Sequence, residues 1–269
     1  MFKHNIMKKF LVIGNPIEHS LSPKLHNYWI KKNNINAIYE KQNVDKKDLK
    51  DLISKVRVGE VDGINVTVPF KKTVIPYLDE LTYEAKNTQS VNTIYLNNKK
   101  AVGHNTDING FETSIQKSKF NLQNKNVFIL GAGGVAPSII FALNKMKVSK
   151  IYICNRTKEK AENLKNLFKN LNVVDWGDIP NFDLIINATS LGLKKKDKMN
   201  LDFSRIGKYK LFYDVIYNPK ETNFLKSGKD LGNMAVNGKL MFIYQAFSAF
   251  YIWHGIKPDI NEDVYKLLD

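Results

Sequence analysis

Cysteine is nearly absent from this sequence: its 269 residues include only one, Cys154. A single cysteine excludes an intrachain disulfide and any metal site built from a cysteine cluster. We therefore expect no metal and, as the default, a cytoplasmic location. Long apolar runs are absent as well. No stretch reaches the roughly 18 consecutive apolar residues of a membrane-spanning helix, so we expect no association with a membrane.

Acidic residues are few beside the basic ones, with 26 Asp and Glu against 41 Lys and Arg and a formal net charge of +15. A basic chain can bind nucleic acid. Here the lysines are scattered, and there is neither an arginine-rich stripe nor a known nucleic-acid module. We expect no nucleic acid partner and interpret the charge as compositional, with a field that also attracts anionic ligands.

Apolar strand patterns alternate with helical patterns along the first part of the chain. Strands are expected at 10–14, 37–44 and 63–68, and helices at 22–32 and 45–56. The first helix should have Ser22 as its N-cap and Pro23 at its first position. Strand–helix–strand repetition of this kind predicts an α/β fold with a mostly parallel sheet.

A second strand–helix series begins at residue 126. Its expected elements are strands at 127–130, 150–154, 183–186 and 211–214, and helices at 134–146, 158–170, 239–254 and 262–268. A helix near 106–119 could join the two series. We expect two domains, one formed by residues 1–105 with 239–269 and the other by 106–238.

The segment Asn65-Val-Thr-Val-Pro-Phe-Lys71 combines a strand with polar side chains. Strand residues alternate between faces, so Asn65 and Thr67 should point the same way. Pro69 lacks an N–H donor and should end the strand. Lys71 then lies beyond a carboxyl end, where α/β proteins place their chemistry. The pattern suits an oxygen-rich small molecule, and equally a strand that ends with a solvated lysine.

The segment Val127-Phe-Ile-Leu-Gly131-Ala-Gly133-Gly134-Val-Ala136 has the dinucleotide pattern G-x-G-x-x-A between a strand and a helix. Gly131 permits the tight turn, Gly133 lets the backbone approach a pyrophosphate, and Ala136 allows close packing of helix on strand. The phosphates would lie at a helix N-terminus, which favours anions. The alternative is a purely structural glycine turn.

The end of the next strand bears on the choice of nucleotide. An NAD site requires an acid there for the ribose 2′-hydroxyl, whereas this strand ends in Asn155-Arg156-Thr157. Arginine pairs with a 2′-phosphate, so the segment favours NADP. The alternative makes Thr157 a helix N-cap and leaves Arg156 solvated.

Taken together, these motifs resemble the shikimate dehydrogenase family, in family order and from residue 13 to residue 255. The matching segments are Ser20-Leu-Ser22-Pro-x-x-His26-Asn27, Asn65–Lys71, Val91-Asn92-Thr93, Asn105-Thr-Asp107-x-x-Gly110, Gly131–Ala136, Asn155-Arg-Thr157, Asn187-Ala-Thr-Ser190, Asp214-x-x-Tyr217-Asn-Pro219, and Gly238 followed by Gln245.

The resemblance implies an oxidoreductase that reduces 3-dehydroshikimate to shikimate with NADPH, reversibly, on the chorismate route to aromatic amino acids. It implies a substrate domain and a Rossmann-type NADP domain with the active site in the cleft between them, in a monomer or homodimer. The implied substrate ligands are Ser20, Ser22, Asn65, Thr67, Asn92, Tyr217 and Gln245. The implied NADP(H) ligands are Gly131, Ala132, Gly133, Gly134, Val135, Ala136, Asn155, Arg156, Thr157, Lys160, Thr189, Val215 and Gly238.

Lys71 and Asp107 are the catalytic pair that the resemblance implies. Hydride arriving at the C3 carbonyl leaves alkoxide character on its oxygen, which needs a proton or a positive charge. A lysine amine is protonated at neutral pH, and a nearby carboxylate keeps it charged and oriented. We predict Lys71 as proton donor or electrostatic catalyst and Asp107 as its orienting partner. The alternative for Asp107, taken alone, is a helix N-cap after Thr106.

Some features have plainer interpretations or depart from the family pattern. We expect His26 and Cys154 to be packing residues, and likewise the aromatic group Phe242, Phe247, Phe250 and Trp253. Lys160 stands where the family usually has a second arginine, which weakens selectivity for NADP over NAD. Leu240 replaces a glycine after Gly238. The alternatives are a quinate/shikimate dehydrogenase using NAD and a non-catalytic nucleotide-binding protein.

Overall fold

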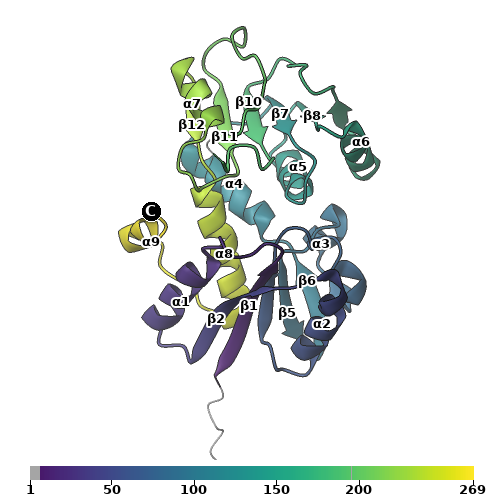
Figure 1. Ribbon diagram of the computed structural model, residues 1–269, viewed down its shortest axis with the longest axis vertical. Helices are drawn as coiled ribbons and strands as arrows, with labels where there is room; N and C mark the ends of the chain where they lie inside the picture. The colour runs from purple at the N-terminus through teal and green to yellow at the C-terminus, as the bar shows by residue number, and fades with distance from the viewer. Residues whose placement is uncertain (1–6, 195) are drawn as a thin grey trace, which may run out of the picture. The chain divides into compact units, whose positions relative to one another are not determined.

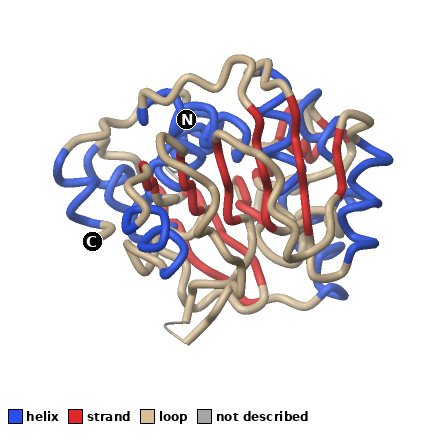
Figure 2. Tube along the Cα trace, turned by 90° about the horizontal axis from the view of Figure 1, so that it is seen from above, coloured by secondary structure: helices blue, strands red, loops and turns tan. Residues whose placement is uncertain are grey.

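The computed structural model describes residues 7–194 and 196–269. By the contacts between its residues, the chain divides into two compact units. The first unit is Met1–Thr106 with Gln245–Asp269, and the second is Asp107–Tyr244. Each unit is a sheet with helices around it (Figure 1), and the strands and helices can be followed by colour in Figure 2.

The first unit contains a six-stranded sheet in the order β2-β1-β3-β5-β6-β4. Its strands are β1 (Lys8–Gly14), β2 (Ala37–Asn43), β3 (Gly63–Val66), β4 (Glu80–Leu81), β5 (Thr93–Asn97) and β6 (Lys100–His104). Its helices are α1 (Ser22–Lys32), α2 (Leu49–Arg57), α3 (Tyr83–Thr88) and α9 (Glu262–Leu267), with single 3-10 turns at Lys46–Asp48 and Ile75–Tyr77.

This first sheet is mixed and, as expected, mostly parallel, since three of its five neighbouring strand pairs are parallel. Strand β1 runs parallel to β2 and β3, and β4 parallel to β6, but β5 is antiparallel to both β3 and β6. The β5–β6 pair is closed by the turn at Asn98 and Lys99, whose φ angles are 47° and 66°. Two consecutive positive φ angles close a tight hairpin, so the chain returns antiparallel instead of crossing over.

The two faces of the first sheet are covered by different elements. On one face, Leu11 and Ile13 of β1 join Leu52 and Ile53 of α2 in a buried cluster. On the other, Phe10 contacts the Trp253 ring of α8 (Lys239–His254), with 4.9 Å between ring centroids. Alternate residues of β1 are therefore buried on opposite sides, as expected of a central strand.

The predicted aromatic group on α8 takes part in the core, although it is not uniformly buried. Phe250 is fully buried, whereas Phe242, Phe247 and Trp253 are half-buried. Trp253 donates its indole N–H to the Ile94 carbonyl of β5 at 3.1 Å. The expectation of core packing is therefore confirmed for Phe250 and holds in part for the rest.

Two predicted boundaries in this unit are wrong by one or two residues. The N-cap position of α1 is Leu21, which makes no side-chain capping bond, and Ser22 is the first helical residue. The Ser22 N–H donates instead to Ser20 Oγ at 3.3 Å. Strand β3 ends at Val66 because the Phe70 N–H donates to the Thr67 carbonyl and turns the chain.

The second unit contains a six-stranded sheet in the order β12-β11-β10-β7-β8-β9, with every neighbouring pair of described strands parallel. Its strands are β7 (Asn126–Leu130), β8 (Lys150–Cys154), β9 (Leu171–Val173), β10 (Leu184–Asn187), β11 (Leu211–Asp214) and β12 (Met234–Val236). Its helices are α4 (Asp107–Ser118), α5 (Ala136–Lys145), α6 (Lys158–Leu167) and α7 (Asn223–Asp230), and α8 begins in this unit. The order reverses between β7 and β10, as in doubly wound dinucleotide folds.

Both faces of this second sheet are buried. Val127 and Ile129 of β7 belong to the cluster that includes Ile139 of α5, while Phe128 belongs to the cluster that includes Phe224 of α7. Parallel strands covered by helices on both sides are almost uniformly apolar. This explains why the run 127–130 could be identified as a buried strand from its composition.

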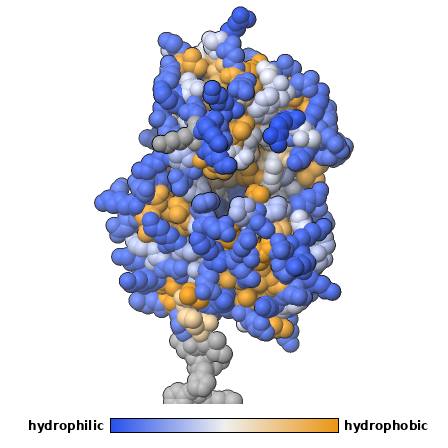
Figure 3. All heavy atoms as spheres, viewed as in Figure 1, coloured by the Kyte–Doolittle hydropathy of each residue, from blue (hydrophilic) through white to orange (hydrophobic). Residues whose placement is uncertain are grey.

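The surface is polar over most of the face shown in Figure 3, with apolar residues in separate patches. No helix among the described residues is long and apolar enough to cross a membrane.

Candidate active site

The glycine turn after β7 has the geometry that its sequence predicts. Gly131 has φ +104°, and a Cβ atom there would lie 2.7 Å from Thr189 Cγ2 and 3.0 Å from the Ala188 carbonyl. Its N–H donates to the Cys154 carbonyl of β8 at 2.8 Å. Neither the conformation nor the space admits another residue.

Gly133 differs from Gly131 in what surrounds it. The nearest atom to a Cβ at Gly133 would be the Ala188 carbonyl oxygen, 3.9 Å away, so this glycine is not needed for packing. Gly133 and Gly134 are exposed, and α5 begins two residues later at Ala136. An open glycine backbone leading into a ten-residue helix fits the approach of a phosphate anion to free N–H groups.

Asn155 ties the end of β8 to the glycine turn. Its Oδ1 accepts the Ala132 N–H at 3.0 Å, and its Nδ2 donates to the Thr157 carbonyl at 2.8 Å. Thr157 occupies the N-cap position of α6 but makes no side-chain capping bond. Arg156 and Lys160 are exposed. The predicted 2′-phosphate ligands therefore present cationic side chains to solvent beside the turn.

Asn65 lies in a buried polar network of the first unit. Its Oδ1 accepts the Tyr39 hydroxyl at 2.6 Å, and its Nδ2 donates to the Asn92 carbonyl at 3.0 Å and to Thr93 Oγ1 at 3.1 Å. Both N–H bonds of the amide are therefore used within the protein. What Asn65 can still offer a ligand is a lone pair on Oδ1, which accepts from a hydroxyl group.

Asn92 anchors the backbone that leads to Asp107. Asn92 Oδ1 accepts the Thr106 N–H at 2.7 Å, and its Nδ2 donates to Thr106 Oγ1 at 2.9 Å. Asp107, the next residue, begins α4 and is 6% exposed. Asp107 is thus inside the helix rather than at its N-cap.

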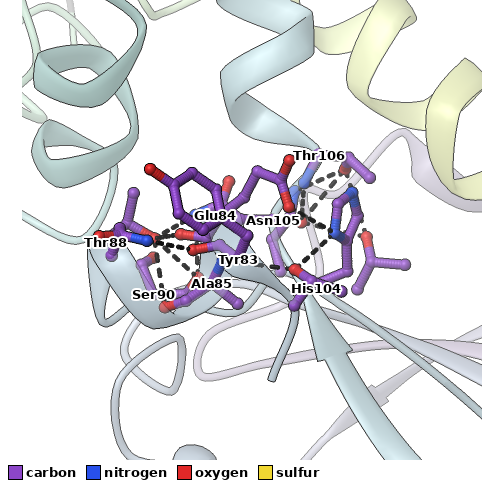
Figure 4. A network of polar contacts seen from close by, with 12 residues as sticks. Tyr83, Glu84, Ala85, Thr88, Ser90, His104, Asn105 and Thr106 are labelled. Carbon is purple, nitrogen blue, oxygen red and sulfur yellow. Dashed lines mark hydrogen bonds and ion pairs between the residues drawn. The ribbon is translucent and has the colours of Figure 1, made fainter. Parts of the chain in front are cut away.

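A second set of hydrogen bonds anchors the preceding residue, Asn105, as Figure 4 shows. The Asn105 side chain donates to the Ser90 carbonyl at 2.9 Å and to Thr88 Oγ1 at 3.2 Å. Asn105 and Thr106 are both nearly fully buried. The two networks together hold the chain rigidly just before Asp107.

The predicted ligands Ser20, Thr67 and Lys71 come from two loops of the first unit that are joined to each other, and Ser22 begins α1 directly after the first loop. The Asn15 N–H donates to the Val68 carbonyl at 3.1 Å, which links the loop after β1 to the turn after β3. Ser22 is buried, while Ser20, Thr67 and Lys71 are half-buried. The two loops therefore lie side by side beyond the carboxyl ends of the neighbouring parallel strands β1 and β3.

The other predicted site residues lie on α8 and in the second unit. Gln245 is on α8 in the first unit, whereas Tyr217 is in the second and stacks on Phe242, with 4.5 Å between ring centroids. Thr189 follows β10, and Val215 and Gly238 follow β11 and β12. Their roles, and the pairing of Lys71 with Asp107, stay predictions.

Asp214 is a residue whose importance the motif alone did not reveal. It is fully buried at the end of β11, and burial raises the pKa of its carboxyl group to about 6, against hydrogen bonds from Thr222, Ile216 and Asn187 that lower it. The sequence signal was present, because an acid at the end of an otherwise apolar strand must be satisfied by buried donors.

Two residues that could be mistaken for catalysts have structural surroundings. His26 is fully buried and stacked on Tyr39 at 4.2 Å, neither ring nitrogen has a hydrogen-bond partner among the described residues, and burial lowers its pKa to about 3. Burial raises the pKa of the Cys154 thiol to about 12. His26 is therefore neutral, and Cys154 is not a nucleophile at neutral pH, as expected.

Comparison with known proteins places these features in a family context. Three family models match: the shikimate dehydrogenase substrate binding domain at residues 12–94, shikimate/quinate 5-dehydrogenase at 114–221, and the shikimate 5′-dehydrogenase C-terminal domain at 240–262. The chain is 56% identical over 262 residues to the shikimate dehydrogenase (NADP⁺) of Pelagibacter ubique, covering 97% of this chain and 99% of the relative.

Solved structures agree with the sequence relatives. The crystal structure of shikimate dehydrogenase from Aquifex aeolicus is 37% identical with a TM-score of 0.90, covering 100% of this chain and 99% of that one. The Thermus thermophilus enzyme in complex with NADP(H) and shikimate is 28% identical with a TM-score of 0.87, covering 97% of each chain.

Proposed function

The chain belongs to the shikimate dehydrogenase family, and from that premise we propose how its own residues carry out the family's reaction. The protein is an NADP-dependent oxidoreductase of the shikimate pathway, which interconverts 3-dehydroshikimate and shikimate. When bound, NADPH supplies the hydride. The proposal concerns which side chains bind the two ligands and which moves the proton.

The turn from Gly131 to Ala136 holds the pyrophosphate of the dinucleotide. The open backbone at Gly133 and the N-terminus of α5 support this assignment, because they offer N–H groups where no side chain intrudes. Arg156 and Lys160 bind the 2′-phosphate as exposed cations. Thr189, Val215 and Gly238, on the loops after the neighbouring strands, line the nicotinamide end of the same ligand.

The loops after β1 and β3 bind the substrate. The hydroxyls of Ser20 and Ser22 bind its carboxylate, and Thr67 binds a ring hydroxyl. Asn65 accepts from a ring hydroxyl, because its amide N–H groups are already donated to Asn92 and Thr93. Asn92, Tyr217 and Gln245 complete the set.

Lys71 delivers the proton in the direction of reduction. Its ammonium group donates to the substrate oxygen that becomes the C3 hydroxyl, and its positive charge stabilises the negative charge developing there. Asp107 hydrogen-bonds the substrate and keeps Lys71 charged and oriented. The anchoring of Asn105 and Thr106 supports this role, since a preorganised carboxylate needs a fixed backbone.

The observation that carries the proposal is the glycine turn, whose Gly131 is sterically required and whose Gly133 is not. The test is an absorbance assay at about 340 nm with shikimate or quinate and with NADP or NAD, in all four pairings. Turnover should be fastest with shikimate and NADP. Turnover with quinate and NAD alone would overturn the assignment of substrate and coenzyme.

A further inference from the structure

We propose that Asp214 is a positioning residue, which holds the loops after β10 and β11 in the arrangement that the coenzyme and Tyr217 require. The inference rests on the proposed function, because it concerns the loops that carry Thr189, Val215 and Tyr217. Asp214 itself touches no ligand in this account. It acts through the backbone and side chains that it binds.

The Asp214 carboxylate joins three separate groups. Asp214 Oδ1 accepts from Asn187 Nδ2 and from the Ile216 N–H, each at 3.0 Å. Asp214 Oδ2 accepts the Thr222 hydroxyl at 2.6 Å. Asn187 ends β10, 27 residues before Asp214, whereas Ile216 and Thr222 belong to the segment between β11 and α7. One buried side chain thus connects two loops that are far apart in sequence.

All three partners donate to Asp214, and the two nitrogen partners, the Ile216 N–H and the Asn187 amide, have no other role there. Asn187 Oδ1 already accepts the Thr189 N–H at 3.1 Å and the Thr189 hydroxyl at 2.7 Å, so its amide nitrogen must face Asp214. The Thr222 oxygen accepts the Leu225 N–H at 3.3 Å, so its hydrogen is directed to Asp214. A group with several acceptors fits these three donors, and among side chains of this size a carboxylate offers the most.

The connection extends directly to residues expected at the coenzyme. Thr189 is fixed by Asn187, and its hydroxyl oxygen accepts the Leu191 N–H at 3.0 Å. The Gly238 N–H donates to the Ile216 carbonyl at 3.0 Å, and a Cβ atom at Gly238 would clash with the Val215 carbonyl oxygen. The loop after β12 therefore also takes its position from the segment that Asp214 holds.

The burial of Asp214 suits positioning better than simple stabilisation of the fold. The carboxylate is fully buried and forms no ion pair with a described lysine or arginine, so three neutral donors compensate its charge. Burying a charge in this way is costly, and an apolar residue would serve a purely structural purpose at lower cost.

The test compares Asp214→Asn with Asp183→Asn in the full-length protein. Asp183 directly precedes β10, at the opposite end of that strand from Asn187, and its Oδ2 accepts the Asn126 N–H at 2.9 Å. In Asp214→Asn the new NH₂ group faces a donor, and the loops lose their common anchor. We expect the calorimetric Kd for NADP and the KM for shikimate to rise at least tenfold, and both to stay within twofold in Asp183→Asn. Unchanged Kd and KM in folded Asp214→Asn would overturn the proposal.

A second pair keeps the test decisive if Asp214→Asn does not fold. Thr222→Val removes the hydroxyl that donates to Asp214 and nearly preserves the side-chain shape, while Thr222→Ser restores the hydroxyl. We expect at least a threefold rise in both constants for Thr222→Val and wild-type values for Thr222→Ser. Equal values for the two variants would contradict the role. Because NADP binding is measured without turnover, failure of the wild type to oxidise shikimate would refute the proposed function separately.

Discussion

Two glycines of the same turn should respond in opposite ways to replacement by alanine. At Gly131 the φ of +104° costs an alanine about 1–2 kcal/mol. The contacts of 2.7 and 3.0 Å add about 1–3 kcal/mol, as overpacking does. The unfolding free energy of Gly131→Ala should therefore fall by about 2–5 kcal/mol in urea. At Gly133 neither term applies, and its alanine variant should keep the wild-type unfolding free energy within about 1 kcal/mol.

The binding of NADP should separate the two positions further. The methyl group of Gly133→Ala occupies the space that the pyrophosphate needs, so its Kd for NADP should rise at least tenfold in a stable protein. Gly177→Ala is the control for backbone strain alone, because Gly177 has φ +112° and a Cβ atom there would meet no other atom within 4 Å. A wild-type Kd in Gly133→Ala would refute the placement of the pyrophosphate at this turn.

Three further predictions follow from other parts of the molecule. Tyr39→Phe and Tyr213→Phe each remove one buried hydroxyl and should each lower the unfolding free energy by about 1–2 kcal/mol. Only Tyr39→Phe should raise the KM for shikimate, because only the Tyr39 hydroxyl donates to Asn65. Equal KM values in the two variants would contradict this prediction. Arg156→Ala should raise the KM for NADP at least fivefold and leave the KM for NAD unchanged. An equal rise in both KM values would contradict the assignment of Arg156 as a ligand of the 2′-phosphate. Because the pKa of Asp214 rises from 3.8 to about 6 on folding, the protonated form favours the folded state. This stabilisation is complete below pH 3.8 and is lost as the pH rises through 6, so the unfolding free energy should fall by about 3 kcal/mol over that range. Urea unfolding of Asp214→Asn should not show this pH dependence.

Much of the fold could be predicted because its signals are local. The run 127–130 is apolar without alternation, and Gly131 follows it at once, so strand, turn and helix are readable from neighbouring residues alone. The helix Lys239–His254 could be placed to the residue for the same reason. The exact start of a helix was harder to predict, because it depends on single hydrogen bonds. The N-cap of α1 is Leu21 instead of Ser22, whose N–H donates to Ser20 Oγ.

The features that sequence did not reveal depend on partners far along the chain. The alternation of strand residues predicted which residues share a face with Asn65. It gave no sign that the hydroxyl of Tyr39, 26 residues earlier, donates to Asn65 Oδ1. Asn97 and Asn98 are residue types that favour a turn, yet the antiparallel pairing of β5 with β6 follows from two positive φ angles that composition does not specify. Asp214 became interpretable only once Asn187 and Thr222 were seen to donate to it.

The most direct test of the account is the kcat for shikimate oxidation by Lys71→Ala, measured beside Lys72→Ala and together with the Kd for NADP. Lys72 is the matched control, because it is the adjacent lysine and is exposed. Lys71→Ala should lose at least about a hundredfold in kcat with an unchanged Kd, while Lys72→Ala should keep both wild-type values. A kcat of Lys71→Ala within about threefold of the wild type would contradict the role of Lys71 as proton donor.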